Sequence, residues 1–311
     1  MLVDIILQVF VFMYELNIIL SSTWKFFNTQ FALTLIGTSV AAFAGVLGAH
    51  FILERFKLKD QLLRELRNTN AAIMISFEIC NSMLALKNQY VKQLGVSYQE
   101  AKTAFDAFQV RRHENKISRG EFFELQTDFL TLNPMLMPSE ILLKQVFEET
   151  SPGARALTLT NTLVRSIDSL NRSVSQRNEL IETWKLKPKP ANQAELPQYH
   201  DRLVEFYFGL RDPAGHIDQS YPNSVEAICS LTDDCIQFSS MLCSDLVEYA
   251  QKLKKRLGNK APNVNTPNFD DAYKKDLMPD EGNYKDWTKM FVKHDKKKKK
   301  SFIFSLFSRK K

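Results

Sequence analysis

The chain has 311 residues, of which 44% are hydrophobic and 24% charged, so it is long enough to bury one large core or two modest ones. Its net charge of +6 is concentrated in residues 293–311, which carry +8, so the rest of the chain sums to −2. A broad DNA-binding face is therefore not supported. Only 10 Gly and 11 Pro are present, and runs of β-branched residues are few, which together predict an all-α fold.

Residues 1–20, MLVDIILQVFVFMYELNIIL, are apolar enough to form a first membrane helix. Asp4, Gln8 and Glu15 form a narrow polar stripe along this helix. The segment is therefore either one half of a transmembrane hairpin, which we favour, or an amphipathic helix on the outer interface. In the hairpin the carboxyl group of Glu15 lies inside the bilayer, where it needs a partner helix, water or a second copy of the chain.

Residues 31–53 are predicted to form a transmembrane helix, which completes a membrane region of residues 1–53. No Asp, Glu, Lys or Arg occurs from Phe26 to Leu53, and about 20 apolar residues are enough to cross a hydrocarbon core. The flank that follows is basic, whereas the preceding flank offers only Lys25. The positive-inside rule then places the main domain in the cytoplasm. We expect an integral protein of the bacterial inner membrane.

Small residues recur at every fourth position of this helix, at Gly37, Ala41, Gly45 and Ala49. In lipid there is no hydrophobic drive between helices, so close backbone approach across small residues supplies the attraction instead. The partner of this strip is either the first helix of the same chain or the same strip in another subunit. Self-association into a homo-oligomer is the favoured alternative.

Residues 54–258 are predicted to form an elongated helical bundle that continues from the membrane helix. Spacings of three and four relate the apolar positions from Leu63 to Leu94, with Asn70 at a position that fixes coiled-coil register. An amphipathic helix of an intrachain bundle has the same periodicity, and the helices downstream favour that alternative. We expect the first helix to end at Gly95. Further helices are expected over 97–112, 122–132, 140–149, 154–186, 198–210 and 224–257, the last closed by Gly258.

The sequence contains no recognisable catalytic, cofactor-binding or metal-binding pattern. GxGxxG, GxxxxGK[ST], GxSxG and HExxH are absent, and the four cysteines form no CxxC pair. His200, in YHDRLVE, could serve acid–base chemistry only beside a nucleophile, so we expect no enzyme activity. The run VEFYFGL at 204–210 is interpreted as core packing, and the alternative is a ligand groove lined by Phe206, Tyr207 and Phe208.

The C-terminal region is predicted to be a flexible linker, residues 259–292, followed by a polybasic and aromatic tail, residues 293–311. Lysines near an anionic cytoplasmic leaflet contribute about 1 kcal/mol each, and inserted aromatic rings add to this. In its mixture of Lys, Phe and Ser the tail is similar to the membrane-binding effector segment of the myristoylated alanine-rich C-kinase substrate family, which implies binding to anionic lipid. Contact of the lysine run with nucleic acid is an alternative that is not favoured. The residues expected to bind the membrane surface are Lys296, Lys297, Lys298, Lys299, Lys300, Phe302, Phe304, Phe307, Arg309, Lys310 and Lys311.

Together these features predict a non-enzymatic, membrane-anchored helical interaction protein without a cofactor. It would act as a scaffold or sensor at the cytoplasmic leaflet, with another protein or a second copy of itself as partner. The leading alternative is a membrane effector of the toxin-like or phage-defence type, in which triggering of the bundle assembles the N-terminal helices into a permeabilising oligomer. A membrane-bound hydrolase that uses His200 is the least favoured alternative.

Overall fold

The computed structural model describes residues 13–19, 21, 30–114, 116, 121–127, 129–209, 215, 217–258 and 261–292. Over these residues the fold is helical with no β-strand, and its longest helix is N-terminal, so the all-α prediction is confirmed there. The chain divides into two compact units, residues 1–63 and residues 64–311. We call the described residues of the second unit the body.

Helix α2 (Gln30–Leu86) continues through a π-helical turn, η1 (Lys87–Val91), into α3 (Lys92–His113). The elements that follow are α4 (Ser139–Phe147), α5 (Ala154–Lys185), the 3-10 turn η2 (Gln193–Glu195), α6 (Leu196–Phe208), α7 (Ser220–Leu257), α8 (Asp270–Lys274), the 3-10 turn η3 (Glu281–Tyr284) and α9 (Lys285–Val292). Helix α7 ends where the sequence predicts, because Gly258 adopts a positive φ of 79° directly after it.

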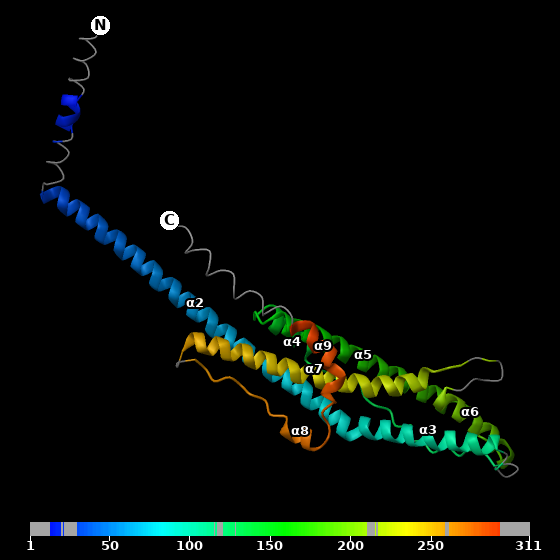
Figure 1. Cartoon of the computed structure of the whole chain (residues 1–311). Helices are drawn as coiled ribbons and strands as arrows, with labels where there is room; N and C mark the ends of the chain where they lie inside the picture. Colours follow the sequence, from blue (N-terminus) through cyan, green and yellow to red (C-terminus); the bar gives the residue numbers. More distant parts are fainter. Residues whose placement is uncertain are drawn as a thin grey trace, which may run out of the picture. The chain divides into compact units, whose positions relative to one another are not determined.

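Helix α7 is the central element of the body, and α5 runs alongside it (Figure 1). The part of α2 after residue 63 also packs on α7, in the antiparallel direction. Cys80 Sγ of α2 lies 3.8 Å from the carbonyl oxygen of Ile236, whereas Cys243 Sγ of α7 lies 3.7 Å from that of Ile73. Small side chains at this contact allow the two helix backbones to approach closely, which supports the helical-bundle prediction.

Gly95 lies inside α3, so the predicted helix end at this residue is wrong. A Cβ atom built on Gly95 would lie 3.2 Å from Sγ of Cys229 on α7, closer than most side-chain contacts. Glycine therefore lets α3 approach α7 at this point. The same residue type that often ends a helix serves here as a close-packing position within one.

The helix predicted over 122–132 is also wrong, because residues 121–127 and 129–138 are not helical. Their apolar side chains enter the core instead of forming a helical stripe. The ring centroid of Phe123 lies 5.3 Å from that of Phe105, and Leu125 is buried. Tertiary packing overrides the local helical preference in this segment.

Residues 261–292 pack against α2 and α7, which corrects the predicted flexible linker over this range. The ring of Phe238 on α7 contacts the rings of Tyr284 and Trp287, at centroid distances of 5.6 and 5.3 Å. The Tyr284 hydroxyl donates to Asp234 Oδ1 at 2.8 Å. Residues 235–240 of α7 are all buried, so this helix needs a cover beyond α2 and α5, and the C-terminal segment supplies it.

Candidate functional site

The first wall of the candidate site comes from η1 and the start of α3. A π-helical turn inserts an extra residue into an α-helix and is frequent at functional sites. Gln89 and Tyr90 of η1, with Gln93, Leu94 and Ser97 of α3, line the same cavity. Gln93 Nε2 donates to Ser97 Oγ at 2.9 Å. This wall is therefore polar but uncharged.

Two asparagines of α5 fix the extended segment 129–138, which forms the second wall. Asn178 accepts from the Leu132 N–H at 3.1 Å and donates to the Leu132 carbonyl at 2.6 Å. Asn171 makes the same pair of bonds with Met135, at 2.8 and 3.0 Å. Each amide thus takes the place of a neighbouring strand. The spacings match, since seven helical residues rise about 10.5 Å and three extended residues span about 10 Å.

Arg177 lies between these walls and is buried, with 2% of its surface exposed. Its Nη1 donates to the Leu130 carbonyl at 2.8 Å, and its Nη2 lies 3.5 Å from the Tyr221 hydroxyl. Its Nε is buried without a hydrogen-bond partner. Among the residues that the structure describes, no carboxylate pairs with Arg177. An arginine side chain stays positively charged in proteins, so a full charge is held here without a countercharge.

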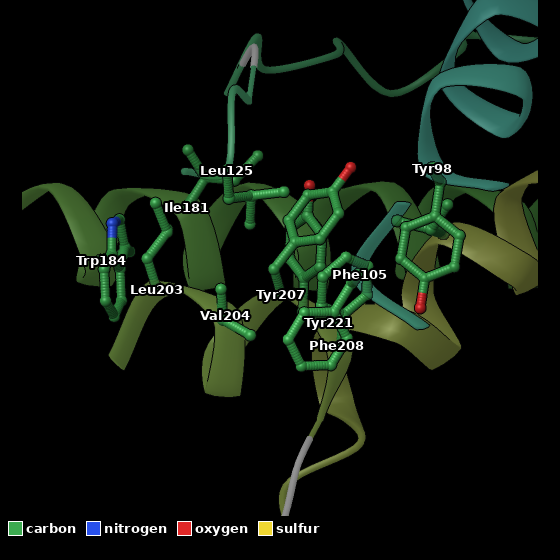
Figure 2. Packing of buried hydrophobic residues seen from close by; sticks show 11 residues of the cluster. Tyr98, Phe105, Leu125, Ile181, Trp184, Leu203, Val204, Tyr207, Phe208 and Tyr221 are labelled. Atoms are coloured by element: carbon green, nitrogen blue, oxygen red, sulfur yellow. The ribbon is translucent and has the colours of Figure 1, made fainter. Parts of the chain in front are cut away.

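The third wall is aromatic and consists of Tyr207 from α6 and Tyr221 from α7. Their ring centroids are 5.1 Å apart at an interplanar angle of 35°. Figure 2 shows the two rings against one another with their hydroxyl oxygens directed to the same side. Burial raises the pKa of the Tyr207 hydroxyl far above its ordinary value, so this group stays neutral.

Tyr207 and Phe208 are buried in one aromatic cluster, and Phe206 stacks on Trp184 at 4.9 Å. The described part of the segment 204–210, residues 204–209, thus contributes to the core, as its interpretation as packing requires. Tyr207 also lines the cavity beside Arg177 and Phe208 lines another, so the ligand-groove alternative stays a prediction.

The cavity is partly open to solvent and has a volume of about 620 Å³, within the range of about 300–1,000 Å³ typical of small-molecule sites. Arg177 is the one charged side chain among its described lining residues, which include no His, Cys, Asp or Glu. The lining residues are Gln89, Tyr90, Gln93, Leu94, Ser97, Gln126, Thr127, Leu130, Leu132, Arg177, Tyr207 and Tyr221.

Sequence reasoning did not select Arg177, although a signal for it was present. The apolar stripe of α5 alternates spacings of three and four, and Arg177 occupies the one stripe position that is not apolar. A charged residue in a buried stripe needs a local reason. The stripe consists of Leu163, Ile167, Leu170, Val174, Arg177, Ile181 and Trp184.

The predicted small strip of α2 is exposed at all of its positions, Gly37, Ala41, Gly45 and Ala49. No described atom lies within 4 Å of a Cβ atom built on Gly37 or Gly45. At about 100° per residue, the strip lies on one side of the helix and the bulky residue Phe43 lies on the other. Glu15 is exposed in the helical segment 13–19. The strip and Glu15 therefore stay predictions.

Asn70 binds the backbone of the same chain in the structure. Its Nδ2 donates to the Asn263 carbonyl at 2.8 Å, and its Oδ1 accepts from the Asn265 N–H at 3.1 Å. Asn70 thus fixes the C-terminal segment to α2. This contact is within one chain, as the intrachain-bundle alternative for the periodic positions from Leu63 to Leu94 requires. The predicted lipid-binding residues from Lys296 to Lys311 lie outside the described residues.

His200, the residue of the hydrolase alternative, packs against aromatic rings. Its ring stacks on Phe122 at a centroid distance of 4.9 Å, and its Nδ1 is buried without a partner. The described residues contain no group of three or more His, Cys, Asp or Glu that could hold a metal ion. The geometry around His200 is that of aromatic packing.

One helix within the described residues is long and apolar enough to cross a membrane, by length and composition. No protein-family model, curated protein or solved structure matches the chain. The residues and geometry described above are therefore the basis for the proposed function.

Proposed function

We propose that this chain is a membrane-anchored helical interaction protein, a scaffold or sensor held at the cytoplasmic leaflet, which catalyses no reaction. The observation that carries the proposal is the exposed apolar surface of α2. Val40, Phe43, Val46, Leu47 and Phe51 are between 56% and 70% exposed. Proteins that stay in water rarely expose a continuous apolar surface of this kind, whereas a bilayer covers it.

The end of this surface has the features of a membrane–water interface. Charged residues resume at Glu54 and Arg55, and the Arg55 guanidinium carbon lies 4.7 Å from the ring centroid of Phe51. Basic and aromatic side chains gather where helices leave the hydrocarbon. The basic residues that follow favour a cytoplasmic location for the body.

Extraction of membranes at alkaline pH tests the anchor. The full chain is expected to stay in the membrane pellet. The double variant Phe43→Asp/Val46→Asp should be released, because each Asp at the centre of a membrane helix costs about 2.5–3.5 kcal/mol. Val110→Asp is the matched control, since Val110 is 56% exposed on α3 in the body. Release of the wild-type chain would contradict the anchor.

The second candidate function is the permeabilising effector, which the open strip at Gly37 and Gly45 supports. A small-residue strip without a partner allows close association with another copy in lipid. A membrane-potential dye distinguishes the two functions. In the effector, expression depolarises the cell and Gly45→Leu abolishes this, whereas Phe43→Leu on the opposite side of the helix leaves it intact. Unchanged potential at high expression contradicts the effector and favours the scaffold.

The tail is proposed as a second membrane attachment. Residues 293–311 combine nine basic residues with four Phe or Leu side chains and one Ile, a combination that favours anionic lipid. A peptide of these residues should bind anionic liposomes, and added salt should weaken the binding. Equal binding to neutral liposomes would contradict the electrostatic mechanism.

A further inference from the structure

The buried charge of Arg177 is not explained by the contacts that it makes. Its Nη1 donates to the Leu130 carbonyl, its Nη2 lies 3.5 Å from the Tyr221 hydroxyl, and its guanidinium carbon lies 5.7 Å from the Tyr221 ring centroid. None of these partners carries a negative charge, and its Nε has no hydrogen-bond partner. Burial of a charge is strongly unfavourable unless the charge is paired. Asn171 and Asn178 fix the same extended segment with neutral amides. A neutral side chain would serve that role at Leu130 as well, so the positive charge needs another reason.

Nearby acids do not supply the missing countercharge within the described residues. Asp233, on α7, forms an ion pair with Lys87 of η1 at 2.7 Å. Glu226, also on α7, is exposed and lines a different cavity. The cavity beside Arg177 is lined by uncharged groups. A negatively charged group bound in the cavity would therefore stabilise the buried charge of Arg177.

The walls indicate what kind of molecule would carry that negatively charged group. The faces of Tyr207 and Tyr221 pack on one another and on core rings, so these residues offer the cavity their hydroxyl groups and ring edges. Gln93 and Gln126 offer amide donors and acceptors on the facing walls. A guanidinium binds carboxylate or phosphate oxygens through its N–H groups.

We propose that this cavity binds a small organic oxyanion, a carboxylate or a phosphate, whose charged group pairs with Arg177 and whose body lies against Tyr207 and Tyr221. The proposal goes beyond the proposed function, because it does not depend on membrane anchoring. It assigns the body a ligand site, in which a bound oxyanion supplies the countercharge that Arg177 lacks among the described residues.

Titration calorimetry on the full chain in nonionic detergent tests the proposal with phenyl phosphate, benzoate, inorganic phosphate and neutral benzyl alcohol as probes. Phenyl phosphate or benzoate should bind at millimolar concentration or below, and benzyl alcohol should not. Preference for one of the two aromatic anions assigns the oxyanion as phosphate or carboxylate. Absence of binding by both would overturn the proposal. Inorganic phosphate that binds as tightly as phenyl phosphate would overturn the assignment of the organic body to the tyrosines.

Variants locate the binding and separate it from folding. Arg177→Met should abolish binding of the anionic probe. Because this variant can also loosen the fold, Gln126→Glu places a negative charge on an exposed wall residue and should weaken binding about tenfold or more. Gln251→Glu is the matched control: it places the same charge on an exposed residue of α7 that does not line the cavity, and it should change the affinity less than threefold. Equal affinity of wild type and Gln126→Glu would overturn the proposal.

One further control concerns Asp128, which lies outside the described residues. If Asp128 were the counterion of Arg177, Asp128→Asn would destabilise the chain as strongly as Arg177→Met does. That result would overturn the proposal. Thermal unfolding of the two variants makes the comparison, and we expect Asp128→Asn to unfold close to the wild-type temperature.

Discussion

Replacement of Asn178 by Ala should destabilise the body, because it removes both hydrogen bonds that hold Leu132. Leu132 is buried, so its N–H and carbonyl groups are left without partners. Two such bonds contribute about 1–3 kcal/mol together. The higher helix propensity of Ala offsets about 0.5 kcal/mol of this loss. The free energy of unfolding should therefore fall by about 0.5–2.5 kcal/mol.

Urea unfolding of the full chain, followed by tryptophan fluorescence, measures this change, since Trp184 is buried on the same helix. Glu179→Ala is the matched control, because Glu179 is the exposed neighbour of Asn178, and its effect should stay within about 0.5 kcal/mol. Addition of Asn171→Ala should give a non-additive loss, since both asparagines hold one segment. A loss for Asn178→Ala no larger than the control would refute the role of the amide pairs.

Three other predictions follow from packing and burial. Gly95→Ala should be nearly neutral alone, because its Cβ would lie 3.2 Å from Cys229 Sγ and this contact offsets the higher helix propensity of Ala. In a Cys229→Ala background the contact is gone, so the same substitution should stabilise the chain by about 1 kcal/mol. Equal effects in both backgrounds would contradict the close contact. Trp287→Ala should lower the unfolding free energy by about 1–2 kcal/mol, since it removes the ring that covers Phe238 of α7. An unchanged free energy of unfolding would favour the flexible linker predicted from the sequence. Burial raises the pKa of Cys80 to about 11 and that of Cys243 to about 12. Because the thiolate is the reactive form, the native thiols should react slowly with a disulfide reagent at pH 8 and faster as the pH rises. Fast labelling of the native chain at pH 8 would refute this.

The long periodic helices could be predicted from sequence because their determinants are local. The apolar stripe of α5 and the glycine after α7 are both visible in a short window. The segment 122–132 could not be predicted, because its partners, Asn171 and Asn178, lie far away in sequence. The packing of the C-terminal segment, residues 261–292, could not be predicted for the same reason. Its Asn- and Pro-rich composition indicates flexibility, whereas Asn70 and Phe238 of distant helices order it.

The candidate site was visible only in part. Tyr207 belonged to a segment that allowed a ligand groove, but its partners across the cavity come from η1, α5 and α7. The π-helical turn has no sequence signal that we could identify. Arg177 did carry one, as the single charge in an apolar stripe. What the sequence could not provide was the absence of a countercharge, which depends on the fold.

The central claim, that α2 lies in a bilayer before it enters the body, is tested most directly by the environment of single spin labels in reconstituted vesicles. Labels are introduced through Phe43→Cys and Val46→Cys, with Val110→Cys in the body as the control and the unsubstituted chain as the background for native thiols. We predict that labels at positions 43 and 46 are reached by oxygen but not by a water-soluble nickel chelate, whereas the label at 110 is reached by the chelate. Access of the chelate to positions 43 and 46 equal to its access to position 110 would contradict the membrane anchor.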